Sequence, residues 1–130
     1  MKSFRRIATT AAVAVLAAGG LVSASSTSAQ ASVGICYLKS YKNPKFNETL
    51  LVPEYTLKLG MHDYCVVGLQ TQINARYNDV LDEDGIFGPQ TQRWVRRIQE
   101  DYWCAGGVDG IAGPNTISCF EHVNGISIWP

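Results

Sequence analysis

Acidic side chains are the residues of this chain with the clearest potential for chemistry, and they gather around one repeated motif. Asp82, Glu83 and Asp84 stand together, and Asp109 lies 25 residues after Asp84. Two carboxylates on either side of a glycosidic bond can hydrolyse it. Asp84 and Asp109, however, each precede a glycine, a position where an Asp side chain commonly hydrogen-bonds its own turn. We therefore interpret both as structural residues and expect that the chain is not an enzyme.

The motif itself occurs twice. Residues 84–91 read Asp-Gly-Ile-Phe-Gly-Pro-Gln-Thr and residues 109–116 read Asp-Gly-Ile-Ala-Gly-Pro-Asn-Thr, with six of eight positions identical. The Asp-Gly step favours a tight turn because glycine accepts positive φ. The Gly-Pro step favours a helix start, since proline is well suited to the first helical position. Each copy therefore predicts a turn followed by a helix, with the side chains of Ile86 and Ile111 pointing into the core.

Metal-binding patterns are not satisfied. A calcium loop of the EF-hand type with Gly85 as its central glycine needs an oxygen ligand at Val80 and an acidic residue at Thr91. His62 and His122 have no third ligand at a spacing typical of zinc sites. The cysteines, spaced by 29, 39 and 15 residues, include no close Cys-x2-Cys pair. We expect no metal and no cofactor.

The first 31 residues have the pattern of a secretory signal peptide. Three basic residues precede an apolar run over residues 7–22, and Ala29-Gln30-Ala31 is an A-x-A cleavage site. The apolar run is short for a membrane span. We expect a secreted protein, extracellular or associated with a cell wall, with no stable membrane insertion and with residues 32–130 as its mature chain.

The expected mature chain is small and weakly acidic. Its 99 residues suffice for one domain, and 8 Lys and Arg against 11 Asp and Glu give a formal charge of 8 − 11 = −3. This charge argues against nucleic acid as a partner. An even number of cysteines in a small exported chain predicts two disulfides, each stabilising by about 2–4 kcal/mol. The sequence alone allows three pairings of Cys36, Cys65, Cys104 and Cys119.

Helical periodicity begins at Asp63, a candidate N-cap. A stripe of apolar residues at three- and four-residue spacing predicts a helix over residues 64–77. Further helices are predicted from Pro89 and from Pro114, each with apolar residues at helical spacing. The stripe of the first helix consists of Val66, Leu69, Ile73 and Tyr77.

The two ends of the mature chain lack this periodicity. Residues 32–56 contain turn signals and short extended pieces, and we expect an irregular arm that packs on the domain. Residues 121–130 form a tail with an Asn-Gly turn. We expect this tail to fold back, because Ile126, Ile128 and Trp129 would otherwise expose a large apolar surface.

Aromatic side chains near the motif are candidate platforms for a ligand. Phe87 lies within the first copy and Trp94 just after it, whereas Ala112 takes the place of Phe87 in the second copy. The two copies are therefore not equivalent. This asymmetry favours one binding groove over two equal sites.

The doubled motif and its surroundings resemble the peptidoglycan-binding domain 1 family, a small three-helix module also called PGBD-like. The resemblance covers residues 57–120 and combines the family patterns Val-x-x-Leu-Gln, Asp-Gly-x-Phe-Gly-x-x-Thr and Val-Asp-Gly-x-x-Gly-x-x-Thr. Asp63 and Ile98 depart from the family, which has a second glycine and an aromatic residue there. The matching residues are Leu57, Gly60, Val66, Leu69, Gln70, Asp84, Gly85, Phe87, Gly88, Thr91, Val95, Gln99, Val108, Asp109, Gly110, Gly113, Thr116 and Phe120.

The resemblance implies an all-α fold, a three-helix bundle with the doubled Asp-Gly turn. Cys104 and Cys119 occupy positions that are apolar in the family, which implies a Cys104–Cys119 bridge and leaves Cys36–Cys65 to attach the arm to the first helix. The candidate ligand-binding residues lie near the repeated turns and the helices that follow them. They are Asp84, Phe87, Thr91, Trp94, Asp109 and Thr116.

The resemblance also implies a function. Members of the family bind bacterial cell-wall peptidoglycan and usually stand beside a hydrolase domain, for which residues 32–130 leave no room. We therefore expect a free-standing, monomeric, non-catalytic protein that binds peptidoglycan through its glycan or its stem peptide. The alternative is a secreted interaction protein, such as a hydrolase inhibitor or an adaptor, that keeps the fold without wall binding.

Overall fold

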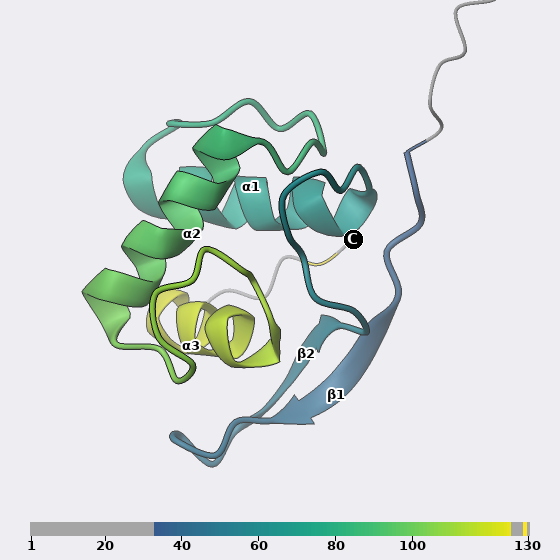
Figure 1. The fold of residues 1–130 in the computed structure, drawn as a ribbon. Coiled ribbons are helices and arrows are strands. Elements are labelled where there is room, and N and C mark those ends of the chain that lie inside the picture. The colour runs from purple at the N-terminus through teal and green to yellow at the C-terminus, as the bar shows by residue number, and fades with distance from the viewer. Residues whose placement is uncertain (1–32, 126–128, 130) are drawn as a thin grey trace, which may run out of the picture. The chain divides into compact units, whose positions relative to one another are not determined.

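A β-hairpin precedes three helices in the computed structural model, which describes residues 33–125 and 129. All the described residues belong to the contact unit Ala31–Pro130. The predicted signal peptide, residues 1–31, and most of the predicted tail after residue 125 lie outside them. In chain order the elements are β1 (Leu38–Lys42), β2 (Thr49–Pro53), α1 (Tyr64–Tyr77), α2 (Pro89–Tyr102) and α3 (Pro114–Asn124) (Figure 1).

The three helices begin at the residues predicted from the sequence. Asp63 is the N-cap of α1, and its carboxylate accepts a hydrogen bond from the Val66 N–H at 3.0 Å. Gly88 and Gly113 are the N-caps of α2 and α3, and a proline follows each of them. These local signals place the helix starts because each satisfies a backbone requirement of the first turn. None of the helices in the described ranges has the length and apolar composition needed to span a membrane.

The core lies between the helices and the segments that lead into them. Each helix contributes an apolar face, and burying one side chain of this size stabilises the fold by about 1.5–3 kcal/mol. Trp129 in the tail packs against the same core. The largest fully buried apolar side chains are Phe87, Phe120, Leu57, Leu69, Ile73, Ile98, Ile117, Val52, Val66 and Val95.

The expected all-α fold and irregular arm need correction, because the arm contains a two-stranded antiparallel sheet. Strands β1 and β2 pair along their whole length, from Leu38 opposite Pro53 to Lys42 opposite Thr49. The alternation of apolar and polar residues that is typical of a strand is weak in this arm, because each strand has five residues. Such a short strand offers only one or two alternations between its faces.

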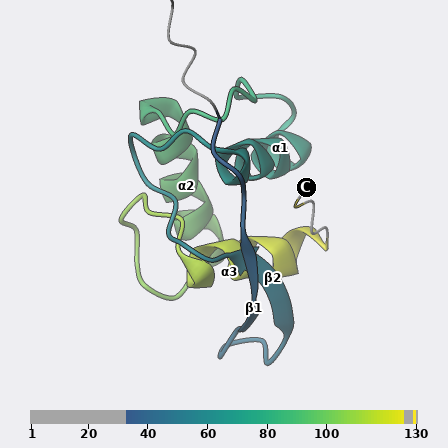
Figure 2. The same cartoon turned by 90° about the vertical axis from the view of Figure 1, so that its right-hand side faces the viewer.

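The hairpin packs against α3. The Asn43 side chain in its turn donates a hydrogen bond to the Ser118 hydroxyl at 2.7 Å. The His122 ring stacks on Phe46 with 3.8 Å between ring centroids, and its Nδ1 lies 2.6 Å from a Glu48 carboxylate oxygen. In both Figure 1 and Figure 2 the tip of the hairpin lies on the far side of α3 from α1. The arm is thus part of the folded domain.

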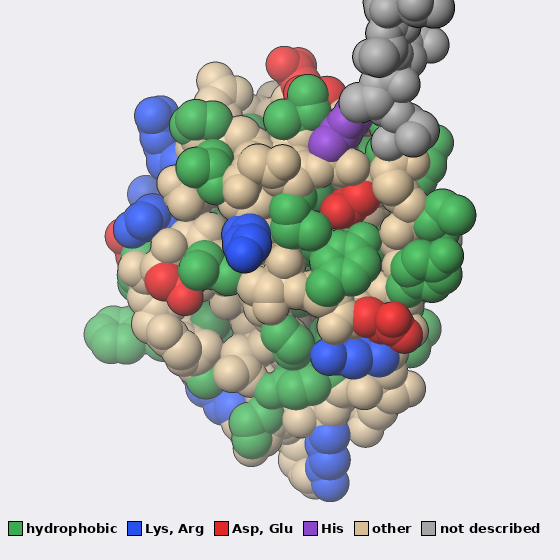
Figure 3. Space-filling model, turned by 45° about the vertical axis from the view of Figure 1, so that its right-hand side comes forward, with side chains coloured by type: hydrophobic (Ala, Val, Ile, Leu, Met, Phe, Trp, Pro, Cys, Tyr) green, Lys and Arg blue, Asp and Glu red, His purple; other side chains and the backbone are tan. Residues whose placement is uncertain are grey.

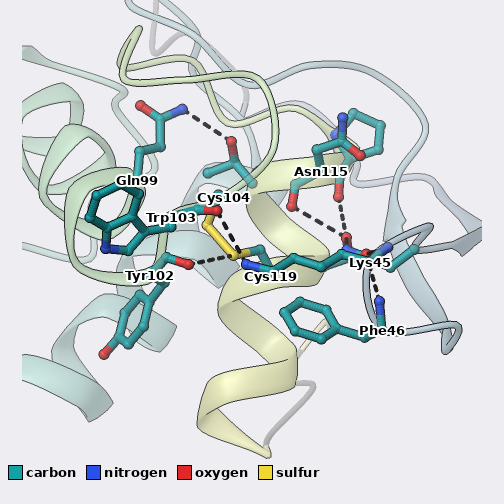
Figure 4. Close-up of a disulfide and its surroundings, with 12 residues drawn as sticks. Lys45, Phe46, Gln99, Tyr102, Trp103, Cys104, Asn115 and Cys119 are labelled. Atoms are coloured by element: carbon teal, nitrogen blue, oxygen red, sulfur yellow. Dashed lines mark hydrogen bonds between the residues drawn. A yellow bond between two sulfur atoms is a disulfide. The ribbon is translucent and has the colours of Figure 1, made fainter.

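Two disulfides are present. Cys36–Cys65 joins the arm to the first turn of α1, and Cys104–Cys119 joins the residues after α2 to the middle of α3. These are the pairs that the family resemblance implies. Figure 4 shows the second bridge beside the C-terminal end of α2. Each bridge ties a connecting segment to a helix.

Candidate functional site

The first copy of the motif is held by a glutamine from α1. The Gln70 amide donates hydrogen bonds to the Asp84 carboxylate at 2.9 Å, to the Ile86 carbonyl at 3.1 Å and to the Thr91 hydroxyl at 3.3 Å. Its carbonyl oxygen accepts the Gly85 N–H at 2.9 Å. Gln70 is 2% exposed, so its own end of each bond lies away from solvent. One side chain therefore fixes both the turn and the start of the following helix.

The second copy is held in the same way by a glutamine from α2. The Gln99 amide donates to the Asp109 carboxylate at 2.8 Å, to the Ile111 carbonyl at 3.1 Å and to the Thr116 hydroxyl at 3.0 Å. Its carbonyl oxygen accepts two N–H groups, those of Asp109 at 3.0 Å and Gly110 at 2.9 Å. We call these two arrangements the first and second glutamine frames.

The two repeated aspartates have structural roles. One carboxylate oxygen of Asp84 accepts the Ile86 N–H at 2.9 Å, and one of Asp109 accepts the Ile111 N–H at 2.8 Å. Burial acts to raise the pKa of Asp84, but hydrogen bonds from Gln70 and from the Ile86 N–H outweigh it and hold the pKa below its usual value. Both carboxylates thus close their own turns, as the sequence predicts.

Each glutamine frame borders a hollow in the surface. The first hollow has a volume of about 210 Å³ and the second about 220 Å³. Seven positions of the first have their repeat equivalents in the second, so the two hollows are built alike. The shared positions are Gln70 and Gln99, Asp84 and Asp109, Ile86 and Ile111, Gly88 and Gly113, Pro89 and Pro114, Gln90 and Asn115, and Thr91 and Thr116.

One expectation about this region is wrong. The side chains of Ile86 and Ile111 point outward, with 49% and 37% of their surface exposed, while Phe87 and Ala112 are fully buried. The reason is that residues 57–62 run beside both turns and form bridges with them, so the buried face is set by pairing across the chain. The expectation of one binding groove stays a prediction, and Phe87 and Ala112, the residues by which the two copies differ, line neither hollow.

The structure brings some of the predicted site residues together and separates others. Asp84 and Thr91 meet at Gln70, and Asp109 and Thr116 meet at Gln99. The sequence did not predict a role for either glutamine. Their signal was the Leu-Gln and Ile-Gln steps, which place a polar side chain next to a core residue on a helix. Within the described ranges, no group of three or more His, Cys, Asp or Glu side chains is arranged to hold a metal ion.

The two aromatic candidates, Phe87 and Trp94, line neither hollow. Phe87 is a core residue. Trp94 is half-buried on α2, where its ring lies 4.7 Å from the ring of Tyr77. It borders a separate hollow on the outer face of α2. Hydrophobic side chains also reach the surface at several other points, as Figure 3 shows for one face of the molecule.

The repeated frames lie within a segment that matches a known family. Residues 66–119 match a family model described as "Putative peptidoglycan binding domain". The match covers 54 of the 130 residues, and over this segment the chain is similar to that peptidoglycan-binding family. The resemblance found in the sequence is therefore confirmed for this segment. The chain matches no curated protein and no solved structure.

The peptidoglycan-binding match accounts for part of the fold. It begins two residues into α1 and ends in the middle of α3, so it contains both glutamine frames and both repeated turns. The hairpin and residues 57–62 lie before it. The Cys104–Cys119 bridge lies inside the matched segment, whereas Cys36–Cys65 lies outside it. The hairpin thus lies outside the matched segment.

Proposed function

We propose that residues 32–130 form a secreted, monomeric bacterial protein that binds peptidoglycan and catalyses no reaction. Residues 1–31 are its signal peptide. The family match supports peptidoglycan as the partner. The two disulfides support an oxidising location outside the cytoplasm or in the wall.

The paired hollows are the observation that carries the proposal. They have nearly equal volumes and equivalent linings, and each has one half-exposed isoleucine at its edge. Peptidoglycan is a polymer of repeating units, so it can offer the same group to both hollows. Two weak contacts on one chain then reinforce each other, because the second contact forms at high effective concentration.

The absence of catalysis is supported by the state of the repeated carboxylates. A glycosidase needs one carboxyl group as acid and another as base or nucleophile, both facing the substrate. Asp84 and Asp109 instead accept backbone N–H groups and the amides of Gln70 and Gln99. An acid held in its own turn in this way is suited to fixing the shape of a hollow.

Co-sedimentation with purified insoluble peptidoglycan tests the proposal. The mature wild-type protein is expected in the pellet. Ile86→Ser and Ile111→Ser each remove about 1 kcal/mol of apolar contact, which is about fivefold in affinity. The double variant is expected to lose more than either single variant. Val123→Ser is the matched control, because Val123 is 41% exposed and lies near the other end of α3 from the second hollow.

The possible results separate the alternatives. A wild-type protein that stays wholly in the supernatant sinks the wall-binding proposal and supports a secreted interaction protein instead. Binding that survives in the double variant would show that peptidoglycan contacts the protein outside the two hollows. Clearing of a wall suspension by the wild-type protein, abolished by Asp84→Asn or Asp109→Asn, would identify an enzyme.

A further inference from the structure

The outer face of α2 carries a third hollow. Its volume of about 340 Å³ is larger than that of either hollow beside the glutamine frames. No residue of that lining belongs to the repeated motif. We call this surface the arginine face; it is lined by Arg93, Trp94, Arg96, Arg97 and Glu100.

Positive charge is concentrated here, in a chain segment that is acidic as a whole. All arginines of residues 32–130 except Arg76 lie on this face. Arg97 pairs with Asp101 at 2.9 Å. Arg93 and Arg96 form no salt bridge with any described residue, so their guanidinium groups remain available for an anion.

Two neighbouring features border the arginine face. The ring of Trp94 is supported from below by Tyr77 at 4.7 Å, so it forms a fixed wall of the hollow. The Arg96 side chain lies against the second repeated turn, where a Cβ on Gly110 would come within 2.9 Å of Arg96 Nε. Since Gln99 holds that turn, the Arg96 side chain lies beside the second glutamine frame.

We propose that the arginine face binds a free carboxylate of the peptidoglycan stem peptide. Arg93 and Arg96 supply the hydrogen-bond donors, and Trp94 packs against the aliphatic part of the peptide. A guanidinium group matches a carboxylate because two of its N–H groups can bond the two oxygens in parallel. The stem peptide carries such carboxylates, whereas the amide-substituted sugars of the glycan offer chiefly neutral groups. This inference rests on the proposed function and assigns the charged part of the same ligand.

A titration with a soluble synthetic stem peptide tests the inference without the wall. NMR of the mature protein is expected to show shifts at the Arg93 and Arg96 Nε–H and at the Trp94 indole. Arg93→Gln/Arg96→Gln should weaken peptide binding at least tenfold. Arg93→Lys/Arg96→Lys keeps the charge but loses the paired donors, so its loss should be almost as large. The charge-matched control is Lys39→Gln/Lys42→Gln on the hairpin, which should bind like the wild type.

Co-sedimentation distinguishes failure of this inference from failure of the proposed function. On intact peptidoglycan the Arg93→Gln/Arg96→Gln variant should bind at least tenfold more weakly than wild type. On glycan stripped of stem peptides by an amidase, with the lactyl carboxylates that this cleavage frees then converted to amides, the two should bind equally. Equal binding to intact peptidoglycan, or no shifts with the stem peptide, overturns the arginine face as a stem-peptide site. A difference between wild type and variant that persists on this stripped glycan, or that disappears when teichoic acid is removed from the wall, overturns it in favour of another anion or a general charge effect.

Discussion

The two repeats have the same glutamine frame, but their preceding connections are stabilised by different means. Residues 78–83, before the first motif, are held by hydrogen bonds from Asn74. Its side chain donates to the Leu81 carbonyl at 2.7 Å and to Glu83 at 3.1 Å, and accepts the N–H groups of Val80 and Leu81. Residues 103–108, before the second motif, are held by the Cys104–Cys119 bridge.

The difference follows from helix length. Helix α1 continues seven residues beyond Gln70, whereas α2 continues three residues beyond Gln99. The additional four residues are about one helical turn, and Asn74 lies in that turn. The second repeat has no helical position from which an equivalent side chain could reach its connection. The frame is thus the constant feature, while a polar network in one repeat takes the place of a covalent bond in the other.

Removing the glutamines should have the largest effect and should affect the second repeat more. Gln99→Leu leaves two N–H groups without a partner and Gln70→Leu leaves one. An unsatisfied buried N–H costs about 1–3 kcal/mol, and the N–H of the exposed Asp109 costs less, so we expect losses of about 3 and about 2 kcal/mol in the free energy of unfolding. Urea denaturation measures both. Equal losses would contradict the view that the second frame depends more on its glutamine.

The control for the glutamine substitutions is Gln90→Leu. Gln90 is exposed on α2 and makes no side-chain hydrogen bond with a described residue. It should change the stability by less than about 0.5 kcal/mol.

Removing the support of each connection should loosen one repeat at a time. Cys104→Ser/Cys119→Ser opens a link between residues 15 apart, which costs about 3 kcal/mol. Asn74→Ala leaves the N–H groups of residues 80 and 81 unpaired and costs about 2 kcal/mol. Amide hydrogen exchange should rise at residues 103–113 in the first variant and at residues 78–88 in the second. Exchange that rises at both connections in either variant would show that the two repeats open together.

Alanine substitutions at the turn glycines should destabilise the two repeats to different extents, because different groups surround Gly85 and Gly110. Gly85 and Gly110 both have positive φ, 74° and 76°, so alanine is strained at either position by about 1–2 kcal/mol. A Cβ on Gly85 would also lie 3.1 Å from the Asp63 backbone oxygen, which cannot move aside easily. On Gly110 it would meet the side chains of Gln92 and Arg96, which can turn away.

We therefore expect Gly85→Ala to lose about 3 kcal/mol and Gly110→Ala about 1–2 kcal/mol by thermal or urea unfolding. Gly107→Ala isolates the backbone strain, because Gly107 has φ 83° and open space around its Cβ position. If Gly85→Ala and Gly107→Ala cost the same, contact with α1 has no part in holding the first turn.

The local signals of the sequence predicted the helices well. Asp63, Gly88-Pro89 and Gly113-Pro114 each satisfy the first turn of a helix through neighbouring residues, so no distant information is needed. The structural role of Asp84 and Asp109 was predictable for the same reason. The family motif then added the three-helix arrangement.

Features that depend on distant residues could not be predicted. The Gln70 and Gln99 side chains bond residues 14 and 10 positions away, and neither spacing follows a helical or strand period. The outward direction of Ile86 is set by the bridge between His62 and Ile86. The hairpin is not predictable from its own residues because its stability comes from packing on α3, as at Asn43 and Ser118.

Lowering the pH should also distinguish the two repeats, and we expect its effect on stability to be the smallest of those described. Hydrogen bonds hold the pKa of Asp84 below its usual value despite the opposing effect of burial. A depressed folded pKa stabilises the fold above the unfolded pKa, about 4, and this contribution is lost as the pH falls through the folded value. The stability difference between wild type and Asp84→Asn should therefore be constant from pH 7 to about pH 5 and shrink below about pH 4. Urea unfolding between pH 2.5 and 7 measures it.

The same acid range should open the first repeat before the second connection, because protonation does not weaken the Cys104–Cys119 bond. Hydrogen exchange of the wild type at low pH is expected to rise at residues 78–88 while residues 103–108 stay protected. Gln90→Leu is the control, since the Gln90 side chain carries no titratable group and its stability difference should not vary in this way. A difference for Asp84→Asn that remains constant down to pH 2.5 would show that the carboxylate fixes its turn equally well when protonated. Low pH would then show no difference between the two repeats beyond the difference in their connections.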